Sequence, residues 1–412
     1  MPTQANRLLS LNSYHYLRGG SDSVYFQHAE LMAEQGWDNA YFSMHHPRNL
    51  PTPWSRHFVD ELEFGHAYRT MDRIAMATKV VYSFEAQRRL RGLLAEYQPD
   101  VAHVHCIYHH LSPSVLPVLH DRGIPVVMTA HDLKIACPAY KMLNDTGICE
   151  RCRQGSVLNV VRHRCIRGSI AASVVVAIES GVHGALQTWG RHIDRIVAPS
   201  RFFLEKFVEW GWPREQFVFI PNCVDAARFT PETAPGDYFL YFGRMAPEKG
   251  VGTLLRAAAL AGVPLKLAGS GPEEAALREL SAELGGVGEF LGFRSGEALH
   301  ELIRGARAVV LPSQWYENAP MSVLEAFALG KPVIGADIGG IPELIDHGST
   351  GWTFESGHVD ELAFTLSHVA ALADSRLQDM GRSARRTVEQ RFNPTGYVAQ
   401  MLEVYAGLGA RV

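Results

Sequence analysis

Short apolar runs alternate with amphipathic helical stretches along most of the chain, and the pattern occurs twice. Strands that alternate with helices at this spacing pair in parallel, with helices on both faces of the sheet. The sequence therefore predicts an α/β fold with two doubly wound domains facing each other across a cleft. The predicted strands are Arg7–Leu11, Ala40–Ser43, Val101–His105, Pro125–Ala130 and Arg195–Pro199 in the first half, and 238–244, 264–270, 308–313 and 332–337 in the second.

A segment rich in proline and turn-forming residues, 221–236, separates the two halves and is interpreted as the domain linker. We therefore predict an N-terminal domain over residues 1–221 and a C-terminal domain over residues 222–391. Residues 392–412 are predicted to form a C-terminal helix that packs back on the N-terminal domain. Ligands of doubly wound sheets bind beyond the carboxyl ends of the strands, so the cleft is the expected site.

Composition limits the function classes. The 412 residues carry a formal net charge of −4, with a pI near 6.6. A nucleic-acid-binding protein would normally be strongly basic, so no nucleic-acid partner is expected, whereas small anions need only local positive charge. The longest apolar stretch, 170–178, is less than half a membrane span. We expect a cytoplasmic protein and leave peripheral membrane contact open.

Two glutamates, Glu317 and Glu325, lie on either side of a predicted helix start. Pro320 suits the first turn of a helix, and Gly330 suits its end. Amides at a helix N-terminus favour an anion, while a carboxylate accepts hydrogen bonds from a diol. A diphosphate with a sugar on one side and a ribose on the other fits this pattern. The alternative is that both are ordinary helix-start and surface acids.

A second motif, "YFGRMAPEKG" (241–250), supplies positive charge. Arg244 and Lys249 follow a predicted strand and lie five residues apart. Arginine binds phosphate as a planar fork and lysine as a point charge, so both side chains could converge on one pair of phosphates. The alternative for this motif alone is a solvated loop with unrelated charges.

Together, "GRMAPEKG" and "ENAPMSVLEAFALGKPVIGADIGGIPELI" resemble the retaining nucleotide-sugar glycosyltransferases of family 4, which have the GT-B fold of two Rossmann-like domains. The resemblance covers nearly the whole chain. It includes "LRGGSDSVYFQHAELMAEQGWD", "TAHDL", "VAPSRFFLEKF", "IPNCVD", "LAGSGPEEAAL" and "LGFRSGEAL".

The resemblance implies roles for individual residues. Arg244 and Lys249 would bind the donor diphosphate, Glu325 the ribose hydroxyls, and Glu317 the donor sugar near the reacting carbon. The family often has a glycine where this chain has Pro320, so one backbone amide is lost. The other residues expected near the donor are Gly19, Gly20, Phe293, Arg294, Asn318, Ala319, Met321 and Ser322.

His131 follows a predicted strand, and the family has a histidine there close to the transferred sugar; a structural histidine is the alternative. Catalysis would need no metal, because Arg244, Lys249 and helix amides stabilise the departing phosphate. The resemblance implies retention of anomeric configuration. The leaving phosphate could accept the proton, and no dedicated base is assigned.

The predicted function is sugar transfer from a nucleoside-diphosphate sugar to a glycan or polyprenyl-diphosphate-linked acceptor, in bacterial polysaccharide synthesis. One alternative is a nucleotide-sugar hydrolase or epimerase of the same fold. Another is a non-catalytic nucleotide-sugar-binding scaffold.

Four of the six cysteines fall in one insertion of the first domain, about residues 137–168: Cys137, Cys149, Cys152 and Cys165. A C-x2-C pair with two flanking cysteines suits a tetrahedral structural zinc site. Free thiols, a disulfide and an iron–sulfur cluster are the alternatives. The insertion is rich in arginine, which suits a lipid diphosphate acceptor or a membrane phosphate, although a solvated basic loop has the same composition.

Overall fold

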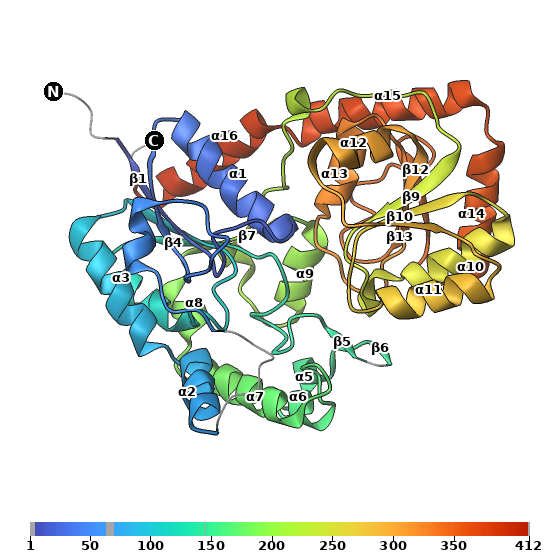
Figure 1. Ribbon diagram of the computed structural model, residues 1–412. Helices are drawn as coiled ribbons and strands as arrows, with labels where there is room; N and C mark the ends of the chain where they lie inside the picture. Colours follow the sequence, from blue (N-terminus) through green and yellow to red (C-terminus); the bar gives the residue numbers. More distant parts are fainter. Residues whose placement is uncertain (1–4, 63–69, 145, 411–412) are drawn as a thin grey trace.

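The protein folds into two parallel-sheet α/β domains, which confirms the predicted fold class (Figure 1). The computed structural model describes residues 5–62, 70–144 and 146–410. Each domain holds one six-stranded parallel sheet. The strand order is β2-β1-β3-β4-β7-β8 in the first sheet and β11-β10-β9-β12-β13-β14 in the second.

The N-terminal sheet is covered by helices on both faces, and its central strands β3 and β4 are wholly buried. Strands buried on both faces are apolar on both, as the VAHV and VVMT sequences mostly are. Its strands are β1 (Arg7–Leu11), β2 (Asp38–Phe42), β3 (Val101–Val104), β4 (Val126–Thr129), β7 (Arg195–Ala198) and β8 (Phe217–Phe219). Its helices are α1 (Gly20–Glu34), α2 (Thr70–Val81), α3 (Phe84–Glu96), α4 (Leu116–His120), α7 (Ile170–Ala185), α8 (Thr188–His192) and α9 (Arg201–Glu209).

The C-terminal sheet has the same architecture, with β9 and β12 side by side at its centre. Its strands are β9 (Tyr238–Phe242), β10 (Leu265–Ala268), β11 (Glu289–Gly292), β12 (Ala306–Leu311), β13 (Val333–Asp337) and β14 (Gly351–Glu355). Its helices are α10 (Val251–Ala261), α11 (Glu274–Glu283), α12 (Gly296–Arg304), α13 (Met321–Ala328), α14 (Val359–Ala371) and α15 (Asp374–Arg391).

Every strand predicted from the sequence is present, with ends within two residues of the prediction. Three edge strands were not predicted from the sequence: β8 at one edge of the first sheet, and β11 and β14 at the two edges of the second. Strand β11 is the clearest case, because its residues are half-buried or exposed. An edge strand needs fewer apolar residues than a central one, so its sequence signal is weak.

Helix α16 (Pro394–Gly407) follows the second domain in the chain but packs against the first, beside α1 (Figure 1). Met401 and Tyr405 are fully buried, in one apolar cluster with Leu8 and Val101 of the N-terminal sheet. The core of the first domain therefore includes residues from both ends of the described chain.

The insertion between β4 and α7 holds four short elements: β5 (Leu143–Asn144), β6 (Gly147–Ile148), α5 (Arg151–Gln154) and α6 (Asn159–Arg162). A buried ion pair anchors its start, because Lys134 Nζ lies 2.7 Å from Glu179 Oε2 on α7. Within the described residues, we find no helix with the length and apolar character that crossing a membrane requires.

Candidate donor-binding site

The two charged motifs predicted from the sequence meet at the carboxyl ends of β9 and β12. Lys249 ends a short 3₁₀ helix, η5 (Pro247–Lys249), in the loop after β9. Glu317 lies in the loop after β12. The Lys249 Nζ atom lies 2.7 Å from Glu317 Oε1, although the two residues are 68 positions apart. Neighbouring parallel strands end at the same edge of a sheet, which explains why these loops meet.

Glu317 is held as a carboxylate in a buried position. Its side chain is 8% exposed, and it accepts a second hydrogen bond, of 2.6 Å, from Ser313 Oγ. Burial alone would raise the pKa of Glu317, but Lys249 and Ser313 outweigh it, so the pKa lies below its usual value. Lys249 is thus paired with the predicted sugar-binding carboxylate.

Gly339 and Gly340 pack directly against the backbone of this loop. Gly340 N donates to Glu317 O over 2.8 Å. A Cβ atom on Gly340 would lie 1.9 Å from Asn318 O, and one on Gly339 would lie 2.4 Å from Glu317 O. Only glycine allows the chain to approach so closely. The sequence analysis noted this segment as part of the family motif but gave its glycines no role.

Glu325 lies on α13, and no hydrogen bond or ion pair of its side chain is found among the described residues. Burial raises its pKa to about 7. The helix begins at Met321, directly after Pro320, which is its N-cap. Gly330, with a φ of 76°, follows the helix end as predicted.

The remaining cationic and aromatic candidates of this domain lie on the surface. Arg244 is exposed and makes no ion pair within the described chain. Burial would raise the pKa of neighbouring Glu248, but Lys141 and, to a smaller extent, Arg244 lower it below its usual value. Phe293 is 71% exposed, and Arg294 Nη1 donates to the Phe293 carbonyl group over 3.1 Å. The structure does not join these two residues to the Lys249–Glu317 pair by any hydrogen bond in its described part.

Asn318 connects the two domains through its side chain. Its Nδ2 atom donates to Ala130 O over 2.8 Å, and its Oδ1 atom accepts from Ser200 Oγ over 2.9 Å. In the next residue, Ala319 O accepts from Asn222 Nδ2 of the linker over 3.0 Å. Asn318 and Ala319 were predicted to lie near the donor, but not to bridge the domains, because a single sequence carries no signal for such a contact.

The N-terminal glycine loop reaches the same helix. Gly19 is the N-cap of α1, and a Cβ atom on Gly20 would lie 3.6 Å from Met321 Cγ. Ser322, the second residue of α13, is half-buried. The structure thus brings the predicted glycine loop and the start of α13 together across the domain interface.

His131 follows β4 and Ala130, the residue whose carbonyl group Asn318 binds. Its Nε2 atom lies 2.8 Å from Nδ1 of His105. Burial lowers the pKa of His131 to about 4, so the ring is neutral at pH 7. His103 lies on β3 and His105 directly follows it, and both are buried and hydrogen-bonded.

The insertion contacts the second domain next to both charged motifs. Lys141 Nζ lies 2.8 Å from Glu248 Oε1, and Tyr316 Oη donates to Glu150 Oε1 over 2.9 Å. Glu248 precedes Lys249, and Tyr316 precedes Glu317. The insertion therefore lies beside the candidate donor site.

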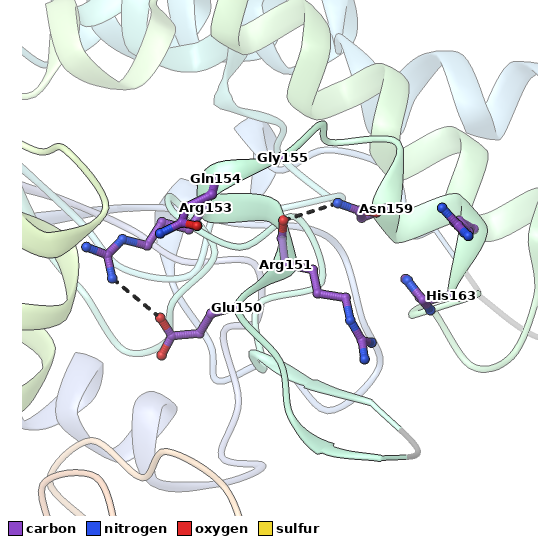
Figure 2. A pocket seen from close by; sticks show the side chains of 8 residues that line it. Glu150, Arg151, Arg153, Gln154, Gly155, Asn159 and His163 are labelled. Atoms are coloured by element: carbon purple, nitrogen blue, oxygen red, sulfur yellow. Dashed lines mark hydrogen bonds and ion pairs between the residues drawn. The ribbon is translucent and has the colours of Figure 1, made fainter.

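The insertion also contains a pocket of about 760 Å³ (Figure 2). Arg153 is turned toward Glu150, whereas the Arg151 side chain extends away from it. The pocket is lined by Glu150, Arg151, Arg153, Gln154, Gly155, Asn159, Arg162 and His163.

The zinc hypothesis finds no support in the arrangement of the side chains. Across residues 5–62, 70–144 and 146–410, no group of three or more His, Cys, Asp or Glu side chains is placed to hold a metal ion. Among the described residues, Cys137, Cys149, Cys152 and Cys165 form no disulfide bond. Burial first, and then the other three thiols, raise the pKa of Cys152 to about 12.

The two domains and their junction define the GT-B architecture, and known proteins of that architecture match over the whole chain. The chain belongs to Glycosyltransferase Family 4, whose family model matches residues 18–228, just over half of the sequence. The model Glycosyl transferases group 1 matches residues 227–387.

Individual relatives are distant. The putative colanic acid biosynthesis glycosyltransferase WcaL of Salmonella typhimurium is 28% identical over 49% of this chain, and the match spans about half of that relative, 54%. The N-acetyl-alpha-D-glucosaminyl L-malate synthase of Bacillus anthracis is 24% identical over 94% of this chain and 93% of its own.

Among solved structures, Anabaena HepE in complex with UDP has a TM-score of 0.67 and 18% identity, covering 97% of this chain and 100% of that one. Sucrose-phosphate synthase from Thermosynechococcus elongatus has a TM-score of 0.70 and 20% identity, covering 98% and 99%. At these identities the likeness establishes the fold.

Proposed function

We propose that the protein is a retaining glycosyltransferase that takes a sugar from a nucleoside-diphosphate donor. The observation that carries the proposal is the buried contact of Lys249 Nζ with Glu317 Oε1 at 2.7 Å, beside the helix that carries Glu325. Anabaena HepE, which has the same fold, was solved with UDP and with UDP and glucose. These complexes support a nucleotide-sugar donor for this chain.

In this proposal, each group acts on one part of the donor. Lys249 and Arg244 bind the diphosphate, and Glu325 as a carboxylate accepts hydrogen bonds from the ribose. Glu317 contacts the sugar near the anomeric carbon, and His131 contacts a sugar hydroxyl group. Negative charge grows on the departing phosphate, where a fixed cation or amide contributes about 3 to 4 kcal/mol.

The reaction then needs no protein nucleophile and no metal ion. The anomeric carbon passes through an oxocarbenium-like state, and the departing phosphate accepts the proton of the incoming hydroxyl group on the same face. Departure and attack on one face give retention. An inverting reaction would instead require a positioned acidic or histidine base, which the proposed site does not use.

A donor screen with matched variants tests the proposal. Nucleoside diphosphates and their sugars are screened by thermal shift, since a ligand that binds only the native state raises the melting temperature. Lys249→Ala should lower kcat about 100-fold or more. Lys266→Ala is the control, because Lys266 lies on β10, where its Nζ atom is 3.8 Å from Glu289 Oε2 and 4.1 Å from the centre of the Tyr238 ring, and it has no role in the proposed site. Unchanged transfer in Lys249→Ala, or an inverted product by NMR, would contradict the proposal.

For the acceptor, we propose a glycan or a polyprenyl-diphosphate-linked glycan, in polysaccharide synthesis. The insertion pocket supports this choice. The charge of Glu150 is offset by Lys206, whose Nζ atom lies 3.0 Å from Glu150 Oε1. Arg151 and Arg162 make no ion pair in the described chain. Arg151 Nη1 donates only a weak hydrogen bond to Cys149 Sγ, at 3.9 Å. Two guanidinium groups that lack a carboxylate partner in one pocket favour a phosphate.

An Arg151→Ala/Arg162→Ala variant tests the acceptor proposal. The KM for a diphosphate-linked acceptor should rise about tenfold, as expected for about 1.4 kcal/mol of lost binding. The donor-induced thermal shift should stay the same. Arg214→Ala serves as control, since Arg214 pairs with Glu205 on the surface. An equal KM in the double variant and the control would contradict the assignment.

Peripheral contact with the inner face of the membrane completes the proposal. Ile170, Val174 and Ile178 recur every four residues on α7 and are 51%, 38% and 51% exposed. An apolar stripe beside a basic segment is typical of helices that lie on anionic lipid surfaces. Flotation with anionic vesicles should carry the wild-type protein but not an Ile170→Gln/Ile178→Gln variant.

A further inference from the structure

His105 is a fully buried histidine in direct contact with His131. It lies just after β3, where its backbone N–H donates to Leu11 O over 2.9 Å. The two imidazole rings are stacked, with centroids 5.1 Å apart and planes 20° apart. They share one hydrogen bond of 2.8 Å, between His105 Nδ1 and His131 Nε2.

Both rings are neutral at pH 7. Burial lowers the pKa of His131 to about 4. Burial, and then the neighbouring histidines, hold the pKa of His105 well below its usual value. A neutral imidazole has one N–H donor and one bare nitrogen acceptor. One ring must therefore donate the shared hydrogen bond and the other must accept it.

The surroundings of His105 determine the direction of that bond. Its other nitrogen, Nε2, is buried and has no hydrogen-bond partner in the described part of the chain. The His105 ring packs against two other rings whose polar atoms are already engaged. The Tyr25 ring lies 5.3 Å away between centroids and its hydroxyl group bonds His15, while the His103 ring lies 4.7 Å away between centroids and both its nitrogens bond hydroxyl groups. Buried N–H groups without an acceptor are rarer than buried acceptors without a donor. The proton of His105 is therefore on Nδ1.

We propose that His105 is a positioning residue that donates its Nδ1–H to Nε2 of His131 and so fixes His131 as the Nδ1-protonated tautomer. His131 Nδ1 has no hydrogen-bond partner among the described residues, which leaves this N–H available to a ligand. The neighbouring Ala130 O is bonded to Asn318, one residue from Glu317. His131 therefore stands at the domain interface next to the proposed donor site.

The tautomer gives His131 a definite chemistry. A neutral ring with Nδ1–H is a hydrogen-bond donor, which suits the oxygen of a sugar hydroxyl group. Its second nitrogen is occupied, so the ring cannot remove a proton from the acceptor. This role of His131 rests on the proposed function, and it agrees with a mechanism in which the leaving phosphate takes the proton of the acceptor hydroxyl group.

Two variants and one spectrum test the inference. Histidine ¹⁵N NMR of the ligand-free protein, with His131 assigned from the spectrum of His131→Gln, should show His131 protonated on Nδ1. His105→Leu removes the donor, so His131 should become a mixture of tautomers. The kcat of the His105→Leu variant should fall about 10- to 100-fold, the range found when a partner that orients a metal-binding histidine is removed. The KM for the donor should change less than threefold.

His105→Asn is the matched rescue, because its Nδ2–H takes the place of the lost Nδ1–H and should restore both the tautomer and kcat. His103→Gln is the control: it alters the adjacent stacked ring, which does not bond His131, and should lower the melting temperature while leaving the tautomer unchanged. Nε2 protonation of His131 in the wild-type protein would overturn the inference. So would an unchanged kcat in His105→Leu. Absence of sugar transfer by the wild-type protein would count against the proposed function alone, since the spectrum needs no substrate.

Discussion

The Lys249–Glu317 pair allows a stability test that requires no substrate. Lys249→Met removes the cation and leaves Glu317, 8% exposed, as a buried carboxylate stabilised only by neutral groups such as Ser313. Removing one partner of a buried ion pair costs about 3 to 5 kcal/mol. Because Lys249 is itself 22% exposed, we expect the low end, about 3 kcal/mol.

The assay is a double-mutant cycle by urea unfolding with Lys249→Met, Glu317→Gln and the double variant. Replacing both charges leaves no ion unpaired. The double variant should therefore lose less unfolding free energy than the two single variants together, by roughly 1 to 3 kcal/mol. A 3 kcal/mol loss corresponds to a melting temperature about 6 to 12 °C lower for a domain of this size.

The pH dependence of the cycle follows from the lowered pKa of Glu317. A carboxyl group whose pKa is lower in the folded state stabilises it above the unfolded value of 4.5 and loses this effect as the pH falls through the folded value. The coupling should therefore be full at pH 7 and shrink below pH 4.5. A coupling under about 0.5 kcal/mol at pH 7, the level found for independent sites, would refute the reasoning.

Three further predictions concern single side chains. Burial raises the pKa of Glu325 to about 7 from 4.5, so the folded state holds this proton more tightly and wild-type stability should fall as the pH rises from 4.5 to 7. Glu325→Gln should remove roughly 3 kcal/mol of that decline in urea titrations, and an equal decline in both proteins would contradict the assignment. Tyr405→Phe removes the hydroxyl group that lies 2.5 Å from His103 Nδ1 and 2.8 Å from His28 Nε2. The free energy of unfolding should fall by about 2 kcal/mol, and a fall under about 0.5 kcal/mol would show that these hydrogen bonds are dispensable. Asn318→Ala deletes two interdomain hydrogen bonds and should increase the radius of gyration in small-angle scattering, whereas an identical scattering curve would show that other contacts hold the domains together.

The sequence predicted the fold well because its information is local. Central strands such as β3 and β4 are apolar and short, and the helices between them have clear periodicity. Edge strand β11 has exposed residues and was missed for that reason. The paired glutamates and the basic motif were found because each motif is compact in the chain.

The sequence could not show contacts that depend on side-chain direction. Nothing in one sequence indicates that Asn318 bonds a backbone carbonyl group of the other domain, or that Lys249 pairs with Glu317. The role of His105 likewise depends on the orientation of two rings. The roles assigned to Arg244, Phe293 and Arg294 stay predictions, and so does zinc binding by the four cysteines, which the arrangement of the thiols does not support.

Helix α16 has a consequence for the order in which the protein folds during synthesis. The ribosome makes this helix only after the whole second domain, yet Met401 and Tyr405 complete the apolar cluster that contains Leu8. The first domain therefore leaves the exit tunnel with part of its sheet uncovered, and its apolar cluster is completed only after the second domain has been translated.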